Sequence, residues 1–255
     1  NGIKNIELSA GAYEKDLIKK LLRLKKEYKC NFHIHNYFPP SKIPFTFNLA
    51  SLDLDIYKLS LNHAKDSIKL SSELGNNVYS FHAGYLVDPN PRQLGKEIRE
   101  KKINNRKDTM KIFLDRLNII SLYAKEKEVE LLLENNVLSK KNFSFFKTNP
   151  FLMTNYLETI NIMENTNSNI NLVVDLAHLK VSAKTENFDP RIFLRKCKKW
   201  IKSYHLSDNN GLSDTNDLIK ENSWFWPHIK KNLNNYCLEI KEKQINIIKS
   251  QKNLI

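Results

Sequence analysis

Short apolar runs recur along the chain, and between them lie longer segments in which apolar residues return at helical spacing. Most of the runs lack the alternation of a half-exposed strand, which is typical of strands buried on both faces in a parallel sheet. We expect strands at Ile3–Leu8, Cys30–His35, Val78–His82, Val129–Glu134, Ile170–Asp175, Trp200–Leu206 and Tyr236–Ile240. We expect helices at Tyr13–Tyr28, Leu54–Leu74, Asn104–Lys127, Pro150–Asn165, Pro190–Lys199, Trp224–Asn232 and Lys243–Leu254, with Pro150 and Pro190 at first helical positions.

Strands and helices alternate over the whole chain without a Gly/Ser-rich linker, which predicts one α/β domain over residues 1–255. A (β/α)8 barrel has eight strands and about 250 residues. Because the sequence opens at Asn1 almost directly into a strand, we predict a (β/α)8 TIM barrel whose first strand and helix are missing from this sequence. The long polar segment Tyr85–Asn105 follows a strand end and is a candidate active-site loop.

The six expected strands from Cys30–His35 onward share a second feature, because each carries a residue type that binds metal ions at its last or penultimate position. These residues are His35, His82, Glu134, Asp175, His205 and Glu239, and two more candidates, His178 and Asp214, lie in the segments just beyond a strand. The carboxyl ends of barrel strands meet at one face and form the floor of the active site. We therefore expect these side chains to converge on one site.

The chemistry of this set favours a catalytic cation. Imidazoles and carboxylates without thiolates suit zinc, manganese or cobalt, and argue against a structural cysteine-rich zinc site. We expect Asp175 and His205 to be ligands, and Glu134 and Glu239 to be an acid/base pair on opposite faces of a bound substrate. Asn136 is expected to hydrogen-bond ligands or substrate hydroxyls.

Each candidate site residue also has a structural interpretation that competes with the functional one. A carboxylate after an apolar strand, such as Glu134, is costly to bury unpaired, which favours function. Of His33 and His35 we expect only one to face the barrel centre, and we favour His35 because it lies nearer the strand end. The aromatic cluster at Trp224 fits helix packing, or alternatively a ring that covers a sugar face.

The strand ends also resemble a known family. The segments Phe32–Tyr37, Phe81–Gly84, Leu133–Asn136, Val174–His178, Tyr204–Asp208 and Leu238–Glu239 resemble, in this order, the xylose isomerase-like TIM-barrel superfamily, which includes sugar (phosphate) isomerases and epimerases and nucleases of the endonuclease IV type. The single-metal isomerase pattern of Glu, Asp, His and Glu maps onto Glu134, Asp175, His205 and Glu239. In the nuclease branch, further zinc ligands map onto His35, His82, His178 and Asp214. That branch has a histidine where this sequence has Asn216, so a third zinc ion is not expected.

Composition adds little to this interpretation. The net charge of +13 suggests an anionic partner, but the lysines are scattered in short pairs, as on a solvated surface. The three cysteines lack metal or disulfide spacing and indicate a reducing, cytoplasmic location. No apolar run approaches the roughly 20 residues of a membrane span.

We therefore predict a divalent-metal-dependent sugar or sugar-phosphate isomerase or epimerase that works by glutamate-mediated proton transfer through a metal-stabilised enediolate. One bound ion is expected, with two or three as the alternative. The second hypothesis is a zinc phosphodiesterase that acts on abasic-site DNA, and the third is a metal-free binding protein. A small carbohydrate is the expected partner, nucleic acid is less favoured, and a homo-oligomer is an open alternative.

Overall fold

A computed structural model describes residues 2–100 and 102–255 of the chain. Its centre is a sheet of parallel strands in the order β1-β2-β3-β4-β5-β6-β7, so each strand lies beside its neighbour in the sequence. The strands are β1 (Asn5–Leu8), β2 (Asn31–His35), β3 (Val78–His82), β4 (Glu130–Glu134), β5 (Ile170–Asp175), β6 (Ile201–Leu206) and β7 (Asn235–Leu238). The fold is an α/β barrel that is nearly closed, and the seven strands expected from the sequence are confirmed to within two residues at each end.

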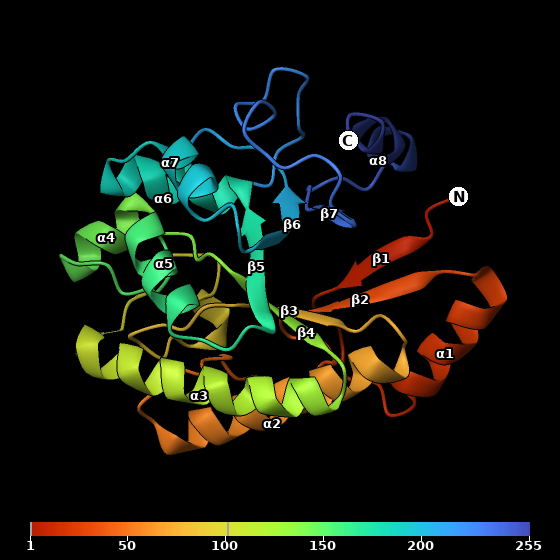
Figure 1. Ribbon diagram of the computed structural model, residues 1–255, viewed down its shortest axis with the longest axis horizontal. Coiled ribbons are helices and arrows are strands. Elements are labelled where there is room, and N and C mark those ends of the chain that lie inside the picture. The colour runs from red at the N-terminus through yellow and green to blue at the C-terminus, as the bar shows by residue number, and fades with distance from the viewer. Residues whose placement is uncertain (1, 101) are drawn as a thin grey trace.

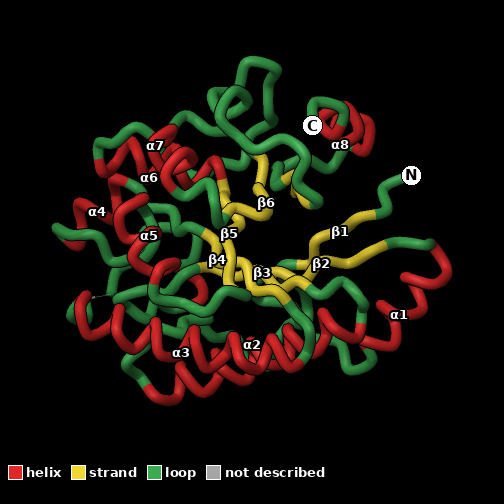
Figure 2. Tube along the Cα trace, in the orientation of Figure 1, coloured by secondary structure: helices red, strands yellow, loops and turns green. Residues whose placement is uncertain are grey.

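Helices surround this inner layer of strands (Figures 1 and 2). They are α1 (Leu17–Tyr28), α2 (Leu54–Glu73), α3 (Arg106–Glu126), α4 (Lys140–Phe146), α5 (Tyr156–Glu164), α6 (Leu176–Glu186), α7 (Pro190–Lys196) and α8 (Ile245–Lys252), with a short 3₁₀ helix, η1 (Pro91–Gln93), in the segment after β3. Side-chain oxygens cap several of the helices, as Asp53 does for α2. None of the helices in the described residues has the length and apolar character that a bilayer crossing requires.

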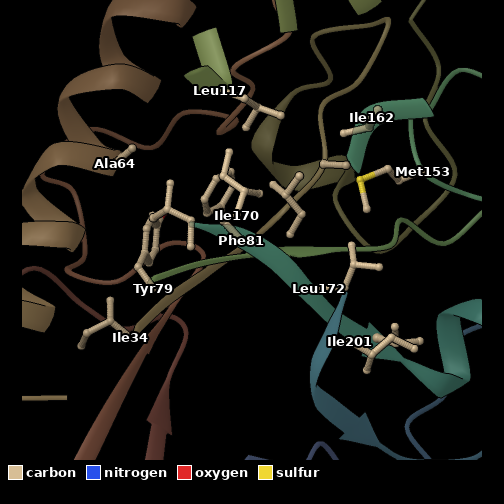
Figure 3. Packing of buried hydrophobic residues seen from close by; sticks show 14 of the residues in the cluster. Ile34, Ala64, Tyr79, Phe81, Leu117, Met153, Ile162, Ile170, Leu172 and Ile201 are labelled. Carbon is tan, nitrogen blue, oxygen red and sulfur yellow. The ribbon is translucent and has the colours of Figure 1, made fainter. Parts of the chain in front are cut away.

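The hydrophobic core lies between strands and helices. Tyr79 and Phe81 of β3 point outward and belong to one buried cluster with Ala64 of α2 and Leu117 of α3 (Figure 3). Of these, Phe81 and Leu117, which are fully buried, each contribute about 1.5–3 kcal/mol. Alternate residues of the same strands point into the barrel, so the outer apolar layer fixes which residues face the centre.

The barrel interior is only partly filled. A cavity of about 420 Å³ is lined by His33, Ser80, Leu132, Val173 and Ser203, which stand two residues before the strand-end candidates of β2 to β6. It extends to the edge strands β1 and β7 and to α8. In the described residues the sheet begins with β1 and ends with β7, and these two strands are not paired with each other. That a further strand completes the barrel stays a prediction.

Helix α1 begins at Leu17 and not at Tyr13, and α7 ends at Lys196 and not at Lys199. Two other predicted helices differ more. Helix α5 begins at Tyr156 and not at Pro150, because Phe151 makes an antiparallel bridge with Tyr85 and Asn155 caps the helix by accepting from the Glu158 amide. Residues 224–232 form turns, since Pro227 within the segment has no amide hydrogen to donate. Helices α4 and α6 were not predicted.

Glycine at position 84 allows the chain after β3 to approach another loop closely. A Cβ atom at Gly84 would overlap the Cβ of Ala50 and lie 3.3 Å from the Ala50 amide nitrogen. We predict that Gly84→Ala lowers the unfolding free energy by about 1–3 kcal/mol through overpacking. Urea denaturation tests this, and adding Ala50→Gly should restore part of the loss. A double variant no more stable than Gly84→Ala would contradict this explanation.

Candidate functional site

The strand-end residues do converge at the mouth of the barrel. His35, His82, Glu134 and Asp175 are the last residues of β2, β3, β4 and β5, and His205 is the penultimate residue of β6. Glu239 directly follows β7, and its amide donates to the Leu206 carbonyl at 3.1 Å. Parallel pairing sets His82 beside Glu134 and Asp175 beside His205, so the backbone ladder itself brings these side chains together.

Glu134 lies at the centre of this arrangement and is 0% exposed. Its Oε2 is 3.2 Å from His35 Nε2 and 3.6 Å from His82 Nε2. Its Oε1 is 3.4 Å from both His178 Nδ1 and His205 Nδ1. One carboxylate is thus surrounded by four imidazoles.

Two groups of potential ligand atoms share Glu134. The ligand atoms of Glu134, Asp175, His205 and Glu239 lie within 4.8 Å of one another, and so do those of His35, His82 and Glu134. The buried cluster is therefore consistent with a divalent metal site.

Several polar atoms in this cluster are buried without a hydrogen-bond partner. They are both carboxylate oxygens of Glu134, Asp175 Oδ2, Glu239 Oε2, His205 Nδ1, His82 Nδ1 and Asp214 Oδ1; of these, Glu239 Oε2 and His205 Nδ1 lie 2.9 Å apart as an ion pair but not in hydrogen-bond geometry. Buried polar groups in proteins are nearly always paired, and each exception needs an explanation. A cation held by the carboxylate oxygens and by Nδ1 of His205 would supply the missing partners.

The start of α6 fixes the next two candidates. Asp175 Oδ1 accepts from the His178 amide at 2.6 Å and caps the helix, which leaves Oδ2 free for the site. Asn135 holds Asp175 from both sides, since it donates to the Asp175 carbonyl and accepts from its amide. His178 Nε2 lies 3.3 Å from Asp214 Oδ2 and joins the β6–β7 loop to the site.

The charges at the site are strongly coupled. Burial opposes ionisation of the Glu134 carboxyl, but the nearby His82, His205 and His35 outweigh burial and hold its pKa well below the usual value. Burial also opposes a charge on His205, and Glu7 and Glu134 overcome it and raise its pKa well above the usual value.

Asp175 behaves in the opposite way. Burial, opposed by His178 and reinforced by Glu239 and Glu134, raises the pKa of Asp175 to about 8. For His178, burial opposes protonation, but Asp175 and Asp214 raise its pKa well above the usual value. The mouth thus gathers the carboxyls of Glu7, Glu134, Asp175, Asp214 and Glu239 in a chain whose net charge is +13. This local excess of acid favours a bound cation.

The expectation that only one of His33 and His35 faces the barrel centre was wrong. Residues two apart on a strand share a face, so both point inward. His33 lines the cavity below the site, whereas His35 is 4% exposed and contacts Glu134. His35 is therefore the one at the cluster.

The two expected substrate contacts occupy different surroundings. Asn136 is buried, and its Nδ2 donates to the carbonyls of Ala83, Gly84 and Leu152, so only its Oδ1 is left for another partner. Trp224 is half-buried, its ring packs edge-on against Phe225, and its buried Nε1 has no partner. Substrate binding by either residue stays a prediction.

Sequence reasoning missed Glu7 on β1. Its Oε1 lies 3.2 Å from His205 Nε2, and its pKa falls to about 2 because His205 outweighs the effect of burial. A signal was present, since Glu7 interrupts an apolar strand near its end. A second cavity of about 320 Å³ opens beside Glu7, His35 and Glu239 and is also lined by Lys241.

Comparisons with known proteins agree with this fold. A family model described as xylose isomerase-like TIM barrel matches residues 1–237. A D-tagatose 3-epimerase-like protein superimposes with a TM-score of 0.72 at 19% identity, over 100% of this chain and 87% of that one. D-psicose 3-epimerase with D-tagatose, from Clostridium cellulolyticum, gives 0.63 at 15% identity, over 98% and 80%. A Thermus thermophilus protein whose crystals were soaked with ZnCl2 gives 0.63 at 17% identity, over 98% and 87%. No curated protein matched the sequence.

The raised pKa values predict how the metal-free protein responds to pH. Between pH 6.5 and 8, Asp175, His178 and His205 keep protons in the folded state that the unfolded chain releases. Raising the pH through this window therefore lowers the unfolding free energy, by up to about 1.4 kcal/mol per pH unit for each proton. Histidines with lowered pKa values, such as His82 at about 4, raise the unfolding free energy with increasing pH mainly below the unfolded histidine pKa of about 6.5. Urea unfolding with a chelator present measures this, and a rise in stability toward pH 8 would contradict the charges described.

Proposed function

Because the chain belongs to the xylose isomerase-like TIM-barrel family, we propose that it is a divalent-metal-dependent sugar or sugar-phosphate isomerase or epimerase. The observation that carries this proposal is the buried cluster at the barrel mouth, where carboxylate oxygens and an imidazole nitrogen face one another without hydrogen-bond partners.

The residues of the first group fit a cation. Glu134, Asp175 and Glu239 each offer an unpartnered oxygen, and His205 offers Nδ1. Asp175 has its other oxygen engaged at the start of α6, which fixes the direction of the free one. We propose these four as the ligands of one zinc, manganese or cobalt ion. His35 and His82 are proposed as ligands of a second ion through their contacts with Glu134, and His178 with Asp214 as further ligands.

The cation, when bound, supplies a Lewis acid that polarises a sugar oxygen and stabilises negative charge that develops beside it. The proton itself is carried by the glutamates. Glu134 is 1% exposed in its side chain, on β4, and Glu239 is 42% exposed, beyond β7, so the two carboxylates approach the site from different walls of the barrel. We propose that one removes a proton from the carbon next to the carbonyl and that the other, or the same one, returns it.

The second cavity offers room for the substrate. It adjoins Glu239 and His35, and Ser9 and Lys241 on its wall could bind sugar hydroxyls or a phosphate. We keep the Trp224 ring and Asn136 Oδ1 as proposed substrate contacts. A carbohydrate substrate is supported by the fold shared with an epimerase whose structure contains D-tagatose. A cytoplasmic location and a homo-oligomeric state stay predictions.

A specific observation also supports the zinc phosphodiesterase hypothesis. His35, His82, His178 and Asp214, which the isomerase pattern does not need, lie within 3.6 Å of another site residue. The residue at position 216 argues against the phosphodiesterase. Asn216 Nδ2 donates to the Glu239 carbonyl at 2.9 Å, so this side chain binds the backbone at the position where the nuclease branch has a metal-binding histidine. A metal-free binding protein is the least supported, because it leaves the buried oxygens of Glu134 without partners.

Elemental analysis of the purified protein tests the metal centre first. We predict about one manganese, cobalt or zinc ion per chain, bound again after removal with a chelator and dialysis against each metal. Asp175→Ala should lower this occupancy, because it removes a buried ligand oxygen. Glu130→Gln, at the other end of β4, is the control and should bind normally. Two or three zinc ions per chain would favour the phosphodiesterase.

Hydrogen exchange at carbon tests the chemistry. We predict that the metal-loaded protein, incubated with ketohexoses, ketopentoses and their phosphates in deuterated water, incorporates deuterium at the carbon beside the carbonyl. Glu134→Gln and Glu239→Gln should lower the rate by at least about 100-fold, the usual effect of losing an acid/base group. Metal content is measured on each variant, because both residues are also proposed ligands. Cleavage of abasic-site DNA that depends on Glu134, without exchange on any sugar, would overturn the isomerase proposal.

A further inference from the structure

We propose that Glu7 is a positioning residue that holds the His205 ring so that its Nδ1 faces the metal site. This inference rests on the proposed function, because it concerns how the same metal site is prepared. Nothing in the family pattern of four ligands involves β1, where Glu7 lies.

The two nitrogens of the His205 ring face different partners. Nε2 lies 3.2 Å from Glu7 Oε1. Nδ1 lies 2.9 Å from Glu239 Oε2 and 3.4 Å from Glu134 Oε1. An imidazole that binds a metal through one nitrogen keeps its proton on the other, and a hydrogen bond from that N–H decides which nitrogen binds. Glu7 therefore accepts the Nε2 proton and leaves the Nδ1 lone pair directed at Glu134 and Glu239.

The surroundings of Glu7 suit this role. Its side chain is 17% exposed, and the ring of His205 is 1% exposed, so little water competes for the Nε2 proton. The Cys237 sulfur on β7 also lies within 4.8 Å of a Glu7 carboxylate oxygen. Since β1 and β7 are not paired with each other, the approach of Cys237 to Glu7 brings side chains of the two edge strands together, and the ion pair with His205 joins β1 to β6.

The same three residues could instead form a separate metal site. Ligand atoms of Glu7, His205 and Cys237 lie within 4.8 Å of one another. We favour the positioning role because a single imidazole would otherwise have to bind ions through both nitrogens, and because Glu7 already pairs with Nε2 of His205. Binding of an ion by these three residues would overturn the inference and is an outcome of the test below.

The test compares zinc binding by the full chain and by three variants. Glu7→Gln keeps an acceptor oxygen but loses the charge, Glu7→Ala removes both, and Glu130→Gln is a matched control on β4 whose carboxylate contacts Asn171 and not a histidine. Zinc affinity is measured by competition with a chelating dye. Loss of a carboxylate that orients a ligand histidine costs 10–100-fold in metal affinity. We expect a loss of about this size for Glu7→Ala, a smaller one for Glu7→Gln and none for Glu130→Gln.

A second readout separates positioning from a general loss of structure. One-bond ¹H–¹⁵N correlation spectra of the zinc-loaded unmodified protein show which ring nitrogen of His205 carries a proton, with the signal assigned by comparison with His205→Asn. We expect the proton on Nε2. In Glu7→Gln the signal should shift or exchange faster, because the charged acceptor is gone. The spectrum of the unmodified protein shows which ring nitrogen of His205 carries the proton, even if Glu7→Ala does not fold.

The outcomes are distinct. Three results would each overturn the role of Glu7 and leave the proposed metal enzyme intact. The first is a proton on Nδ1 of His205, and the second is a zinc affinity of Glu7→Gln and Glu7→Ala within twofold of that of the unmodified protein. The third is a zinc ion that is lost in Cys237→Ala but retained in Asp175→Ala. Failure of the unmodified protein to bind zinc, manganese or cobalt would overturn the proposed function and this inference together.

Discussion

The buried carboxylate of Glu134 is the constraint on which the site depends. A charged group removed from water is costly unless it is compensated. Here four imidazoles lie within 3.6 Å of one carboxylate, yet neither oxygen forms a hydrogen bond. Stability alone would favour an apolar residue at this position. A buried carboxylate without a hydrogen-bond donor at the mouth of the barrel is the kind of local cost that functional sites retain.

The barrel produces this arrangement through strand periodicity. Outward residues such as Phe81 are fixed by packing against the helices, so the residues between them must face the axis. Along β3 to β6, the inward position below each candidate is small or apolar, namely Ser80, Leu132, Val173 and Ser203. On these four strands the candidate ligands therefore occupy the last inward position, at the mouth, while the layer beneath, to which β2 contributes His33, leaves a cavity.

The strands could be predicted from the sequence because each is a local apolar run. The convergence of their ends could be predicted because the carboxyl ends of barrel strands meet at one face. The contacts between individual side chains of the site could not be predicted from the sequence. Glu7 and His205 are distant in the chain, and their contact depends on how the strands tilt and how far the barrel closes. The local pattern also gave a wrong prediction at Trp224–Asn232, where Pro227 lies in the segment and turns form in place of the expected helix. At α6, the helix starts on a site residue, so Asp175 is both cap and candidate ligand.

The central claim is that the unpartnered atoms at the mouth form one cation site. Its most direct test is anomalous diffraction from crystals soaked in zinc, measured on both sides of the zinc absorption edge. The account predicts a peak bounded by Glu134, Asp175, Nδ1 of His205 and Glu239. Absence of a peak there, with the carboxyls paired instead to one another or to water, would contradict it.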